Sequence, residues 1–143
     1  MGATRLGSMS AACVLLLSLG CDSATGPFRP ELTLESGIVF GIPTLPTQVR
    51  VADGVMIVTG VIQTPGTGFT LLGDVTLMPG NDLVVHIHAY DNAPGFAFPS
   101  QNYYRATVKN LSSGDYSVSV IHHHHAPSPG FSQKVFFNTV AIP

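Results

Sequence analysis

The stretch FTLLGDVTLMPGNDLVVHIHAYD, residues 69–91, decides the fold of this chain. Apolar and polar side chains alternate along residues 69–78, and the alternation resumes after the turn-forming PGND at 79–82. A period of two places every second side chain on the same face of a β-strand. The stretch therefore predicts two strands that each have one apolar face. The apolar faces consist of Phe69, Leu71, Val75 and Leu77 in the first strand, and of Leu83, Val85, Ile87 and Ala89 in the second.

The rest of the chain after residue 46 repeats this pattern. QVRVA (48–52) continues through Asp53-Gly54 into VMIVTGVIQ, and a two-residue Asp-Gly link is a strong hairpin signal. Three more alternating runs follow a long loop: YYRATVKN, YSVSVIHH and KVFFNTVAI. No window in this region carries a helical apolar stripe free of Gly and Pro. Short strands without helices predict an all-β fold, a seven-stranded antiparallel β-sandwich over residues 47–143.

Residues 110–120, NLSSGDYSVSV, carry a more specific signal at one turn. Gly114 precedes Tyr116, and alternating valines follow. This arrangement resembles the E–F corner of fibronectin type III and other immunoglobulin-like domains, in which a tyrosine hydroxyl ties the turn to the strand. The resemblance implies an immunoglobulin-like strand order. Because the chain has no Trp and residues 47–143 contain no Cys pair, an antibody-type domain is excluded.

The first twenty residues are of a different kind. Arg5 is followed by the apolar run MSAACVLLLSLG and then by Cys21, an export-signal layout whose apolar run is too short to span a bilayer. The segment LSLGC resembles the lipobox of bacterial lipoproteins, although Ser18 stands where that family usually has Leu. The resemblance implies that residues 1–20 are removed and that a lipid on Cys21 anchors the protein to a membrane of the bacterial cell envelope. An ordinary signal peptide is the alternative.

Residues 21–46 form the predicted link between anchor and body. They hold four prolines and three glycines, which favour a flexible tether with room for one early strand at Leu32 and Leu34. Only one cysteine follows residue 20, so no disulfide within the mature chain is expected and the body must be held by its own core. Charged residues make up 10% of the chain and the net charge is −2, which gives no basic face for nucleic acid.

The six histidines are the chemical lead, and they lie in two places. His86 and His88 occupy alternate positions of VHIHAY, on the face opposite Leu83 and Ile87, so that both imidazoles point the same way. The second place is the run His122–His125. If the alternation of that strand continues, the side chains of His122 and His124 point inward, like Val118 and Val120, and those of His123 and His125 point outward.

Immunoglobulin-like order would bring the outward histidines to one place. In that order, strand 69–78 lies between strands 82–90 and 115–123, and both histidine-bearing strands run in the same direction. Their histidines then share the same outer face, roughly 10 Å apart, and imidazoles that bind at about 2.1 Å can bridge that gap to one zinc or copper ion. The predicted metal site consists of His86, His88 and His123, with His125 as a candidate fourth ligand and Asp91 as a candidate carboxylate.

Other interpretations of the histidines stay open. Outward imidazoles also occur as ordinary surface residues of a sheet. A run of histidines binds Cu²⁺, Ni²⁺ or Zn²⁺ weakly even where metal binding is not its function. Six groups with a pKa near 6.5 would also charge and repel one another in acid. No cysteine or well-placed methionine accompanies them, which disfavours a blue-copper site. No cofactor is therefore certain, and zinc or copper is the candidate.

The aromatic loops offer a second kind of site. Phe96 and Phe98 lie in the long loop 90–104, and Phe131 follows the histidine run. Exposed aromatics on loops contact partner proteins or sugars. The alternative is that Phe96 and Phe98 fold back and cap the open end of the sandwich.

Catalytic motifs are missing from the sequence. It has no G-x-S-x-G, no P-loop and no H-E-x-x-H, and its eight acidic residues are spread singly. We therefore expect a non-catalytic binding or interaction module whose partner in the envelope is unknown. The alternative function is a periplasmic or surface protein that binds copper or zinc through His86, His88 and His122–His125.

Overall fold

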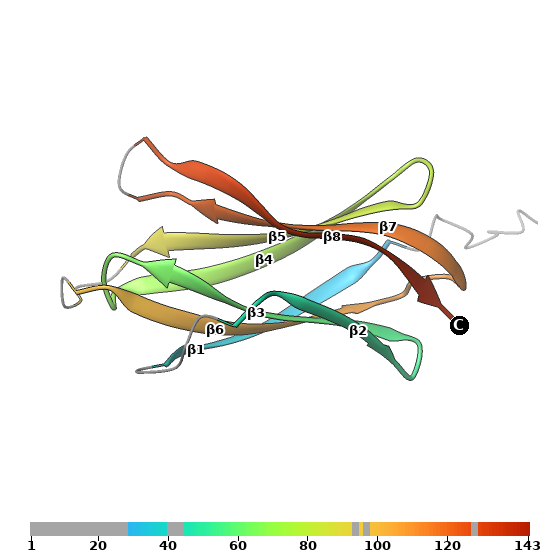
Figure 1. Cartoon of the computed structure of the whole chain (residues 1–143), viewed down its shortest axis with the longest axis horizontal. Coiled ribbons are helices and arrows are strands. Elements are labelled where there is room, and N and C mark those ends of the chain that lie inside the picture. Colours follow the sequence, from blue (N-terminus) through green and yellow to red (C-terminus); the bar gives the residue numbers. More distant parts are fainter. Residues whose placement is uncertain (1–28, 40–44, 93–94, 96–97, 127–128) are drawn as a thin grey trace, which may run out of the picture.

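The structure, a computed structural model, is a sandwich of two four-stranded sheets (Figure 1). It describes residues 29–39, 45–92, 95, 98–126 and 129–143. The strands are β1 (Glu31–Val39), β2 (Gln48–Ala52), β3 (Val55–Thr64), β4 (Phe69–Met78), β5 (Asp82–Asp91), β6 (Ser100–Lys109), β7 (Gly114–His124) and β8 (Phe131–Ile142). The described part of the chain contains no helix long and apolar enough to cross a membrane.

The all-β prediction is confirmed, and the predicted strand count was one too low. All seven expected strands form, and β1 is the eighth. It lies inside the segment interpreted as a tether and pairs along its length with β6. Leu32 and Leu34 on β1 pack against the core. Gly73 on β4 makes room for them, since a Cβ there would lie 2.8 Å from the Leu32 side chain.

The strand order differs from the expected one. The first sheet has the order β1-β6-β3-β2 and the second β4-β5-β7-β8, so β5, not β4, lies next to β7. β5 and β7 pair in parallel, and the other pairings are antiparallel. The chain leaves the second sheet after β5, runs back through the first sheet as β6, and returns as β7, so β5 and β7 point the same way. The prediction of a fully antiparallel sandwich with residues 69–78 in the middle was therefore wrong.

Turns form where the sequence predicts them. Asp53 and Gly54 both have positive φ, 54° and 71°, as the tight turn of a two-residue hairpin requires. At the turn before β7, the hydroxyl of Tyr116 donates a hydrogen bond of 3.0 Å to the carbonyl of Ser112. This is the contact that the resemblance to the E–F corner implied. It anchors the start of the strand that carries the histidine run.

The interior is apolar along most of its length and polar at one end. The inward residues of β5 and the valines of β7 are fully buried, together with Met56 and Val58 of β3. Toward the histidine end, the buried side chains become polar: Thr64, Ser100, Asn102, His122 and His124. Asn102 donates a hydrogen bond of 2.8 Å to the Thr64 hydroxyl, which donates one of 2.8 Å to the carbonyl of Gly66.

Candidate functional site

Four histidines gather on the outer face of the second sheet, in the group that we call the histidine face. It consists of His86 and His88 of β5, with His123 and His125 at the end of β7. The parallel pairing sets His88 directly beside His123, and the backbone N–H of His125 donates to the carbonyl of Ala89. Alternation along both strands then turns all four imidazoles to the same side, because the residues between them face the interior.

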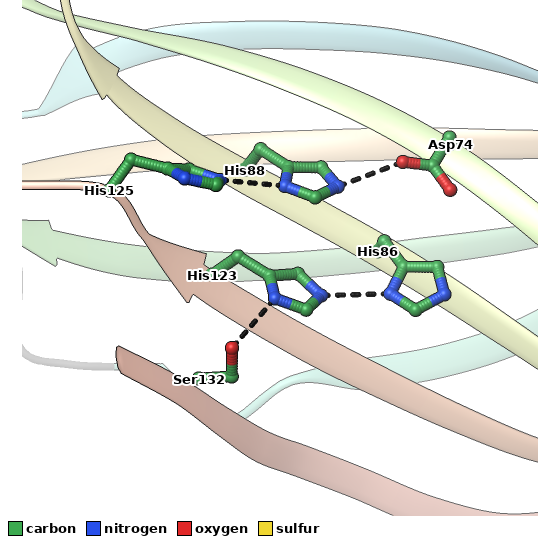
Figure 2. A network of polar contacts seen from close by, with 6 residues as sticks. All are labelled: Asp74, His86, His88, His123, His125 and Ser132. Carbon is green, nitrogen blue, oxygen red and sulfur yellow. Dashed lines mark hydrogen bonds and ion pairs between the residues drawn. The ribbon is translucent and has the colours of Figure 1, made fainter. Parts of the chain in front are cut away.

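The imidazoles form two parallel hydrogen-bonded chains (Figure 2). In one, Nδ1 of His86 lies 2.8 Å from Nε2 of His123, whose Nδ1 lies 2.8 Å from the hydroxyl of Ser132 on β8. In the other, Nδ1 of His88 lies 2.9 Å from Nε2 of His125, and Nε2 of His88 lies 2.8 Å from Oδ2 of Asp74 on β4. All four strands of the sheet thus contribute a side chain to the cluster.

Ring stacking joins the two chains. The rings of His88 and His123 have centroids 4.5 Å apart and planes within 11° of parallel. Tyr90 covers the outer end of the cluster, with its ring 4.1 Å from that of His125 and within 6° of parallel. The histidine face is therefore a packed layer of aromatic rings, not a set of separate surface residues.

The surroundings favour the uncharged form of the His123 imidazole. Burial, and next the charges on His88, His86 and His125, lower the pKa of His123, while Asp74 raises it. At neutral pH His123 is therefore neutral and keeps a free lone pair on one ring nitrogen. A metal ion binds such a neutral imidazole through this lone pair. In the absence of a metal, the two ring nitrogens of His123 exchange hydrogen bonds with His86 and Ser132.

The arrangement is close to metal-binding geometry but does not present a finished site. Among the described residues, no three or more His, Cys, Asp or Glu side chains are arranged to hold one ion. Imidazole lone pairs lie in the ring plane, so the stacked rings of His88 and His123 do not point at a common centre. Within each pair, however, the facing nitrogens are 2.8–2.9 Å apart, and two nitrogens on one tetrahedral zinc are about 3.3 Å apart. To hold one ion, a pair needs to widen by about half an ångström, and both rings need to turn so that their lone pairs point at the ion and not at each other.

The inward histidines belong to a different place. His122 and His124 are 4% and 8% exposed and lie between the sheets, as alternation predicts. Nε2 of His122 is 2.8 Å from the buried hydroxyl of Tyr104, and the ring of His124 stacks on that of Phe131 at 4.2 Å. Burial, with smaller effects from His124 and His123, lowers the pKa of His122 to about 4. These two imidazoles are not part of the histidine face.

The structure places the predicted metal ligands more closely than expected. The predicted separation of roughly 10 Å was wrong because β5 and β7 are direct neighbours and no strand lies between them. The carboxylate that contacts the cluster is that of Asp74, whose Oδ2 lies 2.8 Å from Nε2 of His88. Asp91, the candidate from the sequence, is exposed at the end of β5, opposite Phe69. Asp74 could have been found, since the hairpin turn at 79–81 puts it opposite His86 and on the same outer face.

Two other predicted features fall partly or wholly outside the described residues. Cys21, its lipobox and Phe96 lie there. Phe98 and Phe131 are described, and they are 42% and 54% exposed, respectively. Phe131 lies against His124, at the edge of the interior and away from the outward imidazoles.

Fold and site together define an all-β sandwich that carries a packed histidine layer on one outer face. No protein-family model, no curated protein and no solved structure matches this chain.

Proposed function

We propose that this protein is a non-catalytic binding module of the bacterial cell envelope, and that its histidine face binds a zinc or copper ion. The observation that carries the proposal is the pairing of His86 with His123 and of His88 with His125, at 2.8 Å and 2.9 Å. Each pair joins residues 37 positions apart in the chain, so the fold itself assembles it. Consecutive histidines that bind metal incidentally would do so without being paired with histidines of another strand.

The carboxylate of Asp74 supports the same proposal. It accepts a hydrogen bond from His88, which fixes the tautomer of that ring and leaves the lone pair on Nδ1, facing His125. A carboxylate behind a histidine raises the basicity of the ring and orients it, and such partners are typical of metal-binding histidines. Zn²⁺ and Cu²⁺ are among the ions that imidazole ligands suit.

Calorimetric titration of the purified protein with ZnCl₂ and with CuCl₂ tests the metal. His86→Ala is expected to weaken binding strongly, and Asp74→Asn by about 10-fold to 100-fold, which is typical for loss of an outer-shell partner. His124→Gln is the matched control, because it removes a histidine of the same run that points inward. If His124→Gln weakens binding as much as His86→Ala does, the affinity belongs to the run, and the proposal fails.

We propose further that a lipid on Cys21 holds this module to the membrane. The support is the sequence LSLGC after an apolar export segment, followed by the tether-like residues up to Pro30. Mass spectrometry of the mature N-terminus should find a diacylglyceryl group on residue 21, and Cys21→Ser should move the protein from the membrane fraction to the soluble fraction. A mature chain that begins elsewhere contradicts the anchor.

We also propose that the sandwich is related to immunoglobulin-like domains. The hydrogen bond from Tyr116 to Ser112 supports the relation, and the parallel pair β5–β7 departs from the usual order. Backbone NMR contacts between residues 82–91 and 114–124 test it. Contacts in the parallel register would mean that any relation includes an exchange of two neighbouring strands, whereas contacts of residues 69–78 with 114–124 in their place would restore the usual order.

A further inference from the structure

A cleft of about 750 Å³ opens at the polar end of the interior, away from the histidine face. It lies where β8 and the residues just before β2 face each other across the two sheets. Volumes of 300–1,000 Å³ are typical of sites for small organic ligands, to order of magnitude. The outward histidines His86, His88, His123 and His125 are not among its lining residues, so its contents are independent of the proposed metal.

The wall of the cleft combines apolar and hydrogen-bonding groups. Phe131 contributes an aromatic ring, stacked on His124 and 54% exposed, so one ring face is open. Thr47, Gln133 and His122 add hydroxyl, amide and imidazole groups. Under them, Tyr104 is completely buried, with its hydroxyl between His122 at 2.8 Å and Thr47 at 3.5 Å.

At this end of the interior, the sequence has polar side chains at inward positions that apolar side chains could occupy. On β7 the inward residues change from Val118 and Val120 to His122 and His124, and on β6 they change from Ala106 to Tyr104 and Asn102. Burying polar groups lowers stability unless each one is hydrogen-bonded, and a tightly packed apolar end would avoid that cost. A cleft lined by apolar and aromatic side chains together with a few converging polar groups is typical of a binding site.

The charges around the cleft select an uncharged ligand. Among the residues that the structure describes, no acidic one lines it. The imidazoles of His122 and His124 are only 4% and 8% exposed, and their partners are the uncharged side chains of Tyr104 and Phe131. Lys134 is the one formally charged residue of the described lining, but its ammonium lies 5.2 Å from the centre of the exposed Phe137 ring. Lys134 is paired with Ile121, on the outward side of the sheet.

We propose that the cleft binds a small uncharged ring compound, which packs against Phe131 and exchanges hydrogen bonds with His122 and Gln133. The ring compound is held by one apolar contact and by neutral donors and acceptors. A carboxylate or an ammonium group would lose its hydration there without gaining a partner of opposite charge.

Three probes of nearly equal shape test this class: benzamide, benzoate and benzylammonium. In ¹H–¹⁵N NMR titrations of the purified protein at pH 7, benzamide should shift the amides of residues 122–124 and 131–133 saturably. Benzoate and benzylammonium should bind at least about tenfold more weakly, because each must bury an unpaired charge. Equal affinity for the three probes, or no saturable shift with benzamide, overturns the proposal.

Two exposed phenylalanines of the same strand provide the matched variants. Phe131→Ser should abolish the benzamide shifts, whereas Phe137→Ser, which removes a 66% exposed ring on the outward side, should leave them unchanged. If both variants lose binding equally, the probe binds exposed aromatics in general and the cleft is not the site. Metal titrations of Phe131→Ser should match those of the unaltered protein, which separates this proposal from the histidine face.

Discussion

At the scale of single residues, His122 makes the stability of the protein depend on pH. Its pKa is about 6.5 in the unfolded chain and about 4 in the folded one, because burial disfavours the charged ring. Between these two values the unfolded chain binds more protons, so the free energy of unfolding falls as the pH drops from 6.5 toward 4. The stabilisation is fully present above pH 6.5, and its loss amounts to about 3 kcal/mol.

Urea unfolding between pH 7.5 and pH 4 measures this loss. His123 and His124, whose pKa values are also lowered, act in the same direction. In His122→Gln the dependence on pH should be distinctly shallower, since the residue can no longer take up a proton. An equally steep profile in that variant would show that the dependence comes from other groups.

Gly60 provides a second test at this scale. A Cβ at this position would lie 2.5 Å from the hydroxyl oxygen of Tyr104 and 2.9 Å from that of Thr47. Tyr104 is fully buried and cannot move aside freely, so Gly60→Ala should lower the free energy of unfolding by about 1–3 kcal/mol. Gly37→Ala, also in a strand, meets no atom within 4 Å and should not destabilise the protein. Equal results in the two variants would contradict the close packing around Tyr104.

At the scale of elements, alternation predicted each strand of residues 47–143 and the direction of every described histidine in them. It says nothing about which strands become neighbours, because pairing depends on contacts far apart in the sequence. For this reason the hairpin of β4 and β5 was predicted, and the position of β5 beside β7 was not. β1 was obscured by its neighbouring prolines and by a polar outer face, and only Leu32 and Leu34 indicated it.

A double substitution tests whether β1 belongs to the body. Leu32→Lys with Leu34→Lys places two charges against the core and should lower the free energy of unfolding by about 2–4 kcal/mol, the value of two partly buried leucines. Thr33→Lys with Glu35→Lys changes the exposed side of the same strand and should have little effect. If chemical denaturation finds the two variants equally stable, β1 is not held by the core, and the whole segment 21–46 acts as a tether.

At the scale of the whole molecule, the four consecutive histidines serve both sides of one sheet. His123 and His125 complete the layer on the outer face, and His122 and His124 line the cleft between the sheets. One strand therefore supplies residues to both proposed sites, which differ in chemistry and lie on opposite sides of a single sheet. Substitution of the entire run would disturb both sites, so only single variants can assign a function to either.

Linkage between metal binding and folding separates the assembled histidine face from the bare run. The consecutive histidines 122–125 can bind metal in the unfolded chain as well as in the folded protein. A ligand that binds the folded and the unfolded state equally adds no stability. His86 and His123 meet only in the folded protein, so zinc at about 100 times its dissociation constant should raise the free energy of unfolding by up to about 2.7 kcal/mol at pH 7.5.

Urea unfolding with and without ZnCl₂ measures this linkage at pH 7.5 and at pH 5. Protons compete with the metal for the same imidazoles, so the increment should largely disappear at pH 5. His86→Ala leaves the run of four intact and should remove most of the increment at pH 7.5, whereas His124→Gln shortens the run and should retain it. An increment that follows the length of the run and not the presence of His86 would mean that the folded face contributes nothing to metal affinity.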